Sequence, residues 1–287
     1  MFVVIGFTLQ AQVAINNDGS LPNDKAVLDL QSSNKGLLIP RIDLDTSSIN
    51  MSLGASEAGL MVFNINPDYD NGKGFYYWTG SKWLGLTQTT SAIDYDGNTY
   101  TSVKIGSRIW MAENLRAEHY ADGTSIGNYI SYNFDDSLKN IYGYLYSWDA
   151  VMYNDTSSNS NPSGVQGVCP GGWHVPSKSE IDEMISMMGG DTIAGGPLKE
   201  FGTYHWNSPN KSATNLSHFN AIPAGFFIFA NGMVLFENLG KNAFFWTCTD
   251  TDSDHAYNIT LSYDYEGVWE ASNIKSLSLS VRCVKDN

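Results

Sequence analysis

The stretch VCPGGWHVPSKSEIDEMISMMGG, residues 168–190, carries the strongest structural signals in the sequence. Its second half predicts a helix, because Ser177 followed by Glu180 is a capping box, in which each side chain accepts a hydrogen bond from the other residue's backbone. Four apolar residues then recur at the spacing of one helical face: Ile181, Met184, Ile185 and Met188. Gly189 and Gly190 end the helix. An apolar stripe of this kind is usually core, so we expect it to be buried.

Short strand-like runs follow this helix and are separated by turn residues. They are residues 219–227, 232–236, 244–247, 256–261 and 277–284. Charged residues make up only 16% of the chain, and long amphipathic helices need such residues on their wet face. An all-helical fold is therefore disfavoured, and residues 93–287 are expected to form an α+β domain with few helices and many short strands. Residues 149–167 are rich in Asn, Ser, Asp and Gly, which predicts mostly surface loop.

The first part of the chain predicts a small all-β module at residues 13–90. Short apolar runs alternate there with turn residues, and none shows helical spacing. The run GFYYWTGSKWLGL, which starts at Gly74, indicates a hairpin. It turns near Gly80 and sets Trp78 opposite Trp83, a cross-strand pair that would stabilise the hairpin.

The sequence predicts a two-module, exported protein. A polar linker at residues 87–92 separates module 13–90 from module 93–287. Residues 1–12 are a short apolar run followed by small and polar residues, as in a secretory signal peptide. The basic start of such a peptide is missing, and a buried first strand is the alternative. No stretch reaches the ~18 apolar residues of a transmembrane helix.

The charge balance limits the expected partners. Lys and Arg total 16 against 30 Asp and Glu, which gives a net charge of −14. A chain this acidic repels phosphate backbones and anionic lipid surfaces, so nucleic acid is not an expected partner. Hydrophobic residues make up 42% of the chain, which is enough to bury a core.

The chain has three cysteines, of which two can pair while one is left over: Cys169, Cys248 and Cys283. No Cys-x-x-Cys or Cys/His cluster has the spacing of a zinc site. A bridge between Cys169 and Cys283 would close a loop of more than 100 residues, which the chain-entropy model values at up to ~4–5 kcal/mol. Cys248 lies in a strand-like apolar run, so its thiol is expected to be buried.

Several segments of the second module occur in the order typical of one family. They are Asp94–Tyr100, Val103–Gly106, Trp110–Leu115, Tyr142–Trp148, Val168–Pro176, Pro223–Gly225, Phe245–Thr247 and Ser280–Lys285. Over about residues 94–287 the chain resembles the Fibrobacter succinogenes major paralogous domain. The resemblance implies a C-type-lectin-like or formylglycine-generating-enzyme-like fold, in which a Cys at the first helix is bridged to a Cys in the last strand. Here those positions are Cys169 and Cys283. The family occurs in exported proteins of Bacteroidota and Fibrobacterota, and its molecular function is largely undefined.

The first module is similar to the N-terminal modules of other exported Bacteroidota surface proteins. The similarity lies in the segment GLLIPR at residues 36–41 and in the hairpin GFYYWTGSKW at residues 74–83. Related patterns occur in fibre-like surface proteins. This resemblance implies a homo-oligomer that assembles through residues 13–90.

One acidic cluster is a candidate calcium site. Asp250, Asp252 and Asp254 supply carboxylates at alternate positions, and Ca²⁺ prefers such hard oxygen ligands. The glycine and glutamate that continue an EF-hand loop are absent. A polar turn is the simpler explanation of the cluster, so calcium is a candidate cofactor and no cofactor is certain.

Three aromatic residues in or near predicted loops are candidate ligand-binding residues: Trp206, Tyr257 and Trp269. Their rings could stack on a glycan without a metal, although packing is the preferred interpretation of each. The Glu-Pro-Asn, Gln-Pro-Asp and Trp-Asn-Asp motifs of calcium-dependent sugar binding in C-type lectins are absent.

No residue set indicates catalysis. Cys248 and His255 are near in sequence, but a packed thiol is the preferred interpretation. His174 is expected to be a structural hydrogen bonder, and Glu180 is expected to stabilise the start of its helix. The prediction is therefore a secreted or cell-surface, non-enzymatic protein that mediates adhesion to, or binding of, a surface glycan or protein. The alternatives are a structural subunit of an extracellular filament, assembled through residues 13–90, and an enzyme of an unrecognised kind.

Overall fold

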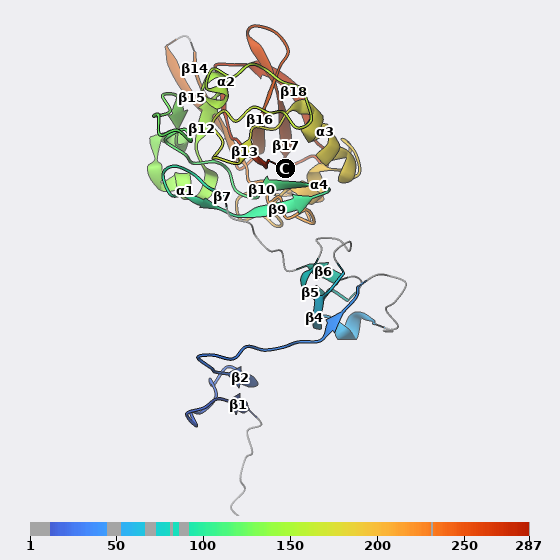
Figure 1. Ribbon diagram of the computed structural model, residues 1–287. Coiled ribbons are helices and arrows are strands. Elements are labelled where there is room, and N and C mark those ends of the chain that lie inside the picture. The colour runs from blue at the N-terminus through green and yellow to red at the C-terminus, as the bar shows by residue number, and fades with distance from the viewer. Residues whose placement is uncertain are drawn as a thin grey trace, which may run out of the picture. The chain divides into compact units, whose positions relative to one another are not determined.

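A computed structural model describes residues 12–44, 53–66, 73–80, 83–85, 92–230 and 232–286 of the chain. The chain divides into two compact units, an N-terminal unit Met1–Leu86 and a C-terminal unit Thr87–Asn287 (Figure 1). The division falls at the start of the predicted linker. The predicted signal peptide lies outside the described residues except for Gln12, and so does the linker except for Ala92. None of the helices in the described ranges is both long and apolar enough to cross a membrane.

The N-terminal unit is built from short strands and one turn of 3₁₀ helix, as the sequence predicts. One sheet pairs β1 (Val13–Ile15) with β2 (Leu28–Leu30) in parallel. The other has the order β3-β4-β5-β6, with bounds Arg41–Ile42, Met61–Asn64, Gly74–Trp78 and Trp83–Gly85. The 3₁₀ turn is Ala55–Glu57.

The predicted hairpin of the N-terminal unit is confirmed. Strands β5 and β6 are antiparallel, Trp78 lies opposite Trp83, and the two ring centroids are 5.6 Å apart in an edge-to-face arrangement. A cluster of four buried residues packs behind the β3–β6 sheet: Leu44, Val62, Tyr76 and Trp83. The described part of this unit therefore has only a small core.

The C-terminal unit contains many short strands in several sheets, as predicted. One sheet has the order β13-β20-β10-β9, with bounds Trp173–His174, Val284–Lys285, Arg108–Met111 and Ser102–Ile105. A second has the order β11-β12-β19-β14-β15, with bounds Tyr129–Ile130, Leu145–Ser147, Ser278–Leu279, Ala224–Ala230 and Met233–Leu239. A third has the order β16-β17-β18, with bounds Asn242–Asp250, His255–Ser262 and Trp269–Ile274. A short pair joins β7 (Ala92–Ile93) to β8 (Thr99–Tyr100).

The helices of the C-terminal unit are few and short. They are α1 (Lys139–Tyr142), α2 (Trp148–Met152), α3 (Lys178–Met187) and α4 (Gly195–Leu198), with 3₁₀ turns at Tyr132–Phe134 and Asp136–Leu138. Helix α3 begins with the predicted capping box of Ser177 and Glu180. Its apolar stripe faces the core, with Ile181, Met184 and Ile185 buried. The long strand β16 contacts both α2 and α3, so it lies at the centre of the unit (Figure 1).

Three local expectations differ from the structure. Helix α2 covers the start of the predicted loop 149–167, because Ser147 caps it and its apolar residues are buried. A five-residue helix is too short to show helical spacing in a sequence. Strand β18 was not predicted, since its exposed side chains show no apolar alternation and pairing with β17 defines it. The predicted final strand 277–284 divides into β19 and β20, which join different sheets.

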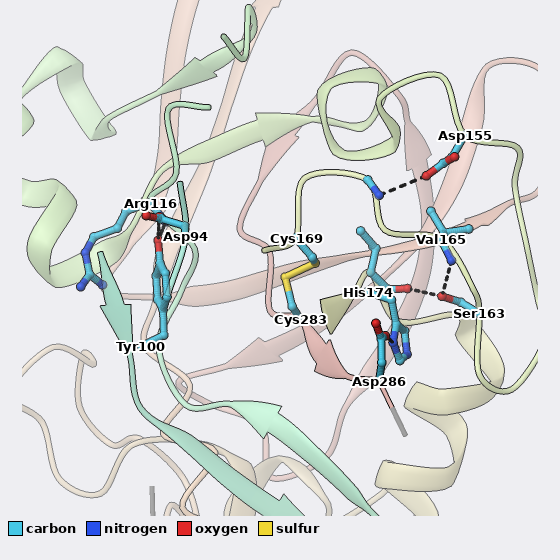
Figure 2. Close-up of a disulfide and its surroundings, with 12 residues drawn as sticks. Asp94, Tyr100, Arg116, Asp155, Ser163, Val165, Cys169, His174, Cys283 and Asp286 are labelled. Atoms are coloured by element: carbon cyan, nitrogen blue, oxygen red, sulfur yellow. Dashed lines mark hydrogen bonds and ion pairs between the residues drawn. A yellow bond between two sulfur atoms is a disulfide. The ribbon is translucent and has the colours of Figure 1, made fainter. Parts of the chain in front are cut away.

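A disulfide closes the C-terminal unit at the predicted positions. Cys169 and Cys283 are bonded, with their Cα atoms 5.9 Å apart, and both are completely buried. Cys169 precedes β13 and Cys283 precedes β20, and these two strands pair with each other. The bond therefore joins the segment before α3 to the end of the chain (Figure 2). Cys248 is the buried free thiol that the sequence predicts.

Candidate functional site

The predicted calcium loop is organised around a lysine. The ammonium Nζ of Lys275 lies 3.3 Å from Oδ2 of Asp250, and it donates to the backbone oxygens of Asp252 and Ser253 at 3.0 and 3.1 Å. The carboxylate of Asp252 is engaged by Nδ1 of His255 at 2.9 Å. Across the described ranges, no group of three or more acidic, His or Cys side chains is placed to hold a metal ion. This geometry gives no support to calcium binding at Asp250, Asp252 and Asp254.

The three predicted ligand-binding aromatics do not form one surface. Trp206 is a core residue with 2% exposure, and its indole N–H donates to the backbone oxygen of Ala221 at 3.0 Å. Burial of this ring favours the packing alternative for Trp206. Trp269 is 46% exposed and stacks on Tyr265 with 4.6 Å between centroids.

Tyr257 and Trp269 lie on opposite faces of their sheet. Trp269 is paired with Thr260 across β17 and β18, and Tyr257 is three residues away from Thr260 along β17. Since side chains alternate between the two faces of a strand, an odd separation puts the two rings on different sides. Tyr257 is half-buried, and its ring lies 5.6 Å from the ammonium of Lys178. Of the three predicted ligand-binding aromatics, only Trp269 has an exposed ring that could contact a ligand.

The thiol of Cys248 has no catalytic partner in the described part of the chain. Burial raises its pKa to about 12, so it is protonated at neutral pH. His255, its neighbour in sequence, is held by Asp252 and is partly exposed. The preferred interpretation as a packed thiol therefore fits the structure.

A buried charge network lies beside the disulfide. It contains His174 and Glu180, the two residues for which the sequence predicts structural roles. Nε2 of His174 lies 2.9 Å from Oε1 of Glu180. Nδ1 of His174 lies 2.6 Å from Oδ1 of Asp286, and Figure 2 shows these two side chains near the disulfide. Arg108 adds a second cation, with Nη1 3.0 Å from the same Oε1. Sequence reasoning missed Arg108, since nothing local links strand β10 to helix α3. The network joins the start of α3 to strands β13 and β10 and to Asp286, which follows β20, and it serves stability.

The protonation of His174 should make the stability of the C-terminal unit depend on pH. Burial alone lowers the pKa of His174, but its hydrogen bonds to Glu180 and Asp286 outweigh burial and hold that pKa above the usual 6.5. The network therefore contributes fully below pH ~6.5, and its contribution is lost as the pH rises through the raised pKa. We expect the free energy of unfolding to fall over this range in the wild type and to be flatter in His174→Gln. Urea unfolding between about pH 5.5 and 8.5 measures it, with His255→Gln as the exposed control. Equal slopes in all three proteins would contradict the assignment.

The candidate functional surface is in the N-terminal unit. Four apolar side chains share one face of the β1–β2 sheet, because Val13 is paired with Leu28 and Ile15 with Leu30. Their exposures are 52%, 54%, 61% and 42% in that order. An isolated two-stranded sheet is only marginally stable in water, and an exposed apolar patch is typical of an interaction surface. The β1–β2 face is therefore a candidate interaction surface.

A second apolar face lies on the other sheet of the same unit. Met61 is paired with Tyr77, and Phe63 with Phe75, on the side opposite the small core. The Phe63 and Phe75 rings are 5.2 Å apart, and Met61 and Phe75 remain 45% and 44% exposed. Together with the small core, this β4–β5 face leaves apolar surface exposed in the described part of the unit. Sequence reasoning placed self-association in residues 13–90 by resemblance and could not identify these faces.

Comparison with known proteins gives two family matches. A family model described as the Fibrobacter succinogenes major domain matches residues 103–285, which is more than half of the chain. A second, described as a phage tail like trimerisation region, matches residues 14–103. That range contains the β4–β5 face, and the β1–β2 face except for Val13. No curated protein matches the chain, and neither does any solved structure.

Proposed function

This chain belongs to the Fibrobacter succinogenes major domain family, and from that membership and the exposed faces of its N-terminal unit we propose an exported, trimeric, non-enzymatic binding protein. Three chains assemble through the N-terminal unit, and each contributes one C-terminal unit that binds a glycan or protein on a surface. The observation that carries the proposal is the β1–β2 face, where four apolar side chains lie uncovered in a unit with a small core.

The trimer is supported by similarity and by physical need. Residues 14–103 are similar to a phage tail like trimerisation region. In a parallel trimer, three copies of an apolar face can cover one another about a common axis, as cyclic symmetry permits. The predicted likeness to fibre-like surface proteins of Bacteroidota belongs to the same proposal.

Export and the lectin-like fold are proposed on the disulfide. A buried bond over a long loop is typical of proteins that fold in an oxidising compartment. It also ties the segment before the longest helix to the end of the chain, which is the arrangement that a C-type-lectin-like domain would have. The non-enzymatic part of the proposal rests on the sequence, in which no residue set indicates catalysis.

The test of assembly uses the full chain. Ile15→Asp/Leu30→Asp places two carboxylates opposite each other on the β1–β2 face, and Asn17→Asp/Ser33→Asp adds the same charge at exposed turn positions. We expect light scattering after size exclusion to give a trimer for the wild type and the control, and a monomer for the face variant, since buried like charges repel. A monomeric wild type would contradict the proposal, and open-ended polymers would favour the filament alternative.

The test of binding compares the same proteins on a glycan array and on outer-membrane extract. A trimer gains avidity from three linked sites, so the face variant should bind the same targets at least about tenfold more weakly. A wild-type trimer that binds no glycan and no extract component would contradict the binding role while leaving assembly intact.

A further inference from the structure

A small cavity in the C-terminal unit has the character of a binding site. Its volume is about 240 Å³, below the range of drug-sized pockets and suited to one small ring. Its walls come from residues 112–116 after β10, from helix α1, from residues 200–205, from residues 220–222 and from Arg282. None of the sequence-predicted ligand residues lines it.

Arg282 is the unusual member of this cavity. It is 2% exposed, and no carboxylate pairs with it among the described residues. Its Nε donates to Oδ1 of Asn114 at 2.9 Å, Nη2 donates to the backbone oxygen of Asn220 at 2.9 Å, and Nη1 donates to the backbone oxygen of Phe219. A guanidinium has five N–H donors, so one on Nη1 and one on Nη2 have no acceptor within the described ranges.

A second buried cation shows what a satisfied site looks like. Lys199 is also buried without a carboxylate, and its ammonium donates to the backbone oxygens of Lys211, Ser262 and Tyr265 at 2.7–2.9 Å. Those three acceptors use all three of its donors. Lys199 therefore has a complete structural role, whereas Arg282 keeps one spare N–H donor on each of Nη1 and Nη2.

The remaining charges around the cavity are already paired. Glu113 is held by Arg116 at 3.1 Å, and Nδ1 of His205 lies 2.8 Å from Glu200. Lys139 is held by a carboxylate outside the lining, Glu118, at 2.9 Å. The guanidinium of Arg282 is therefore the one unpaired charge in the lining of the cavity. Its single positive charge suits a ligand that carries a single negative charge. The carboxylates of Glu113 and Glu200 would repel a dianion such as phosphate.

The rest of the lining suits a sugar ring. The ring of His205 belongs to the lining and packs edge-on against Tyr142 and Tyr204, which lie outside the lining, with centroid distances of 5.6 and 4.6 Å. The imidazole of His205 provides a flat surface for one face of a pyranose. The exposed carboxamide of Asn140 lines the cavity and makes no hydrogen bond to the described residues, so it can serve a hydroxyl group.

We propose that this cavity binds a uronic acid residue of a surface polysaccharide, with the sugar carboxylate received by the spare N–H groups of Arg282. The geometry of a guanidinium fits a carboxylate with two parallel hydrogen bonds, which makes it the usual side chain for such recognition. Burial lowers the pKa of Arg282 to about 9, and a bound carboxylate would offset the cost of that buried charge. This inference rests on the binding role proposed above and names its ligand class.

The experiment titrates the full chain with D-glucuronate and D-galacturonate and, as neutral parents of the same rings, D-glucose and D-galactose. Acetate tests the carboxylate without a ring, and phosphate tests charge alone. Line broadening and saturation transfer by NMR detect binding with a Kd of up to about 10 mM, which is the weak affinity expected for a single sugar ring. We expect each uronate to bind at least tenfold more tightly than its neutral parent, and acetate and phosphate to bind more weakly than either uronate.

Variants locate the binding. Arg282→Lys keeps the charge and loses the paired donors, so uronate binding should fall at least tenfold. If that buried variant does not fold, Asn140→Ala and His205→Ala decide, because both residues lie at the accessible part of the lining and should weaken uronate binding several-fold. Lys104→Met, an exposed lysine of β9 outside the cavity, is the matched control and should bind as the wild type does.

The outcomes separate this inference from the proposed function. A trimer that binds other glycans or proteins but prefers uronates no more than their neutral parents would overturn the inference alone. Uronate binding by a monomeric wild type would support the inference and contradict the trimer. Binding that Asn140→Ala and His205→Ala leave unchanged would place the sugar elsewhere and overturn the assignment of the cavity.

Discussion

Replacement of Glu180 by glutamine is expected to lower the free energy of unfolding of the C-terminal unit by about 3–5 kcal/mol, the cost of removing one partner from a buried ion pair. Glu180 is completely buried, and both of its oxygens face donors. Oε1 faces the cations of His174 and Arg108, and Oε2 accepts from the backbone N–H groups of Ser163 and Ser177 at 3.2 and 3.0 Å. An amide NH₂ in either position would point at two donors, so glutamine cannot restore the network.

The ionisation of Glu180 gives the same prediction a pH dependence. Burial alone raises the pKa of this carboxyl, but the hydrogen bonds from His174 and Ser177, with the charge of Arg108, outweigh burial and hold the pKa below its usual value. The contribution of Glu180 is therefore present above the unfolded-state pKa and is lost as the pH falls through the lowered pKa. The difference between the wild type and Glu180→Gln should narrow on strong acidification.

The matched control for this prediction is Glu183→Gln on the same helix. Glu183 lies 3.7 Å from Arg108 but its side chain is 33% exposed, so its loss should cost less than about 1 kcal/mol. Urea unfolding followed by tryptophan fluorescence at pH 7 compares the two variants. Equal urea midpoints for Glu180→Gln and Glu183→Gln would show that the buried network does not hold α3 to strands β10 and β13.

Local features of this fold were predictable from the sequence, and long-range ones were not. The capping box of Ser177 and Glu180 and the stripe from Ile181 define α3 because their interactions lie within a few residues of one another. The same holds for the hairpin of Trp78 and Trp83. Strand β18 depends instead on pairing with β17, and helix α2 on burial against β16, so neither leaves a periodic signal.

The candidate sites lie beyond local reasoning for the same physical reason. The β1–β2 face requires the parallel pairing of Val13 with Leu28, which no turn motif announces. The cavity around Arg282 collects residues from separate segments of the chain, so an arginine inside a cysteine motif does not reveal its surroundings. Conversely, the clustered carboxylates at 250–254 suggested a metal, but Lys275 pairs with Asp250 and His255 pairs with Asp252 instead.

Removal of the disulfide is the other change with a large expected effect. Cys169→Ala/Cys283→Ala opens a loop whose ends are 114 residues apart. In the chain-entropy model the unfolded state then gains entropy, which lowers the free energy of unfolding by about 4–5 kcal/mol. Marginal proteins have only about 5–15 kcal/mol in total, so the variant should be close to unfolding. Thermal unfolding under non-reducing conditions measures the loss.

The bond joins two short strands that share few hydrogen bonds with each other. Strands β13 and β20 are two residues long each, and outside their pairing the backbone N–H of Asp286 donates to the backbone oxygen of Gly172 at 2.9 Å. Strand β20 is also held by β10 on its other side, where the backbone N–H of Met111 donates to the backbone oxygen of Cys283 at 2.9 Å, so loss of the bond should loosen the β13 side most. The control Cys248→Ala removes a buried thiol that is not bridged, and we expect it to cost only about 1 kcal/mol. A reducing agent should destabilise the wild type and Cys248→Ala but leave the double variant unchanged. A double variant as stable as Cys248→Ala would mean that packing alone holds the end of the chain, and the argument for export would lose its main support.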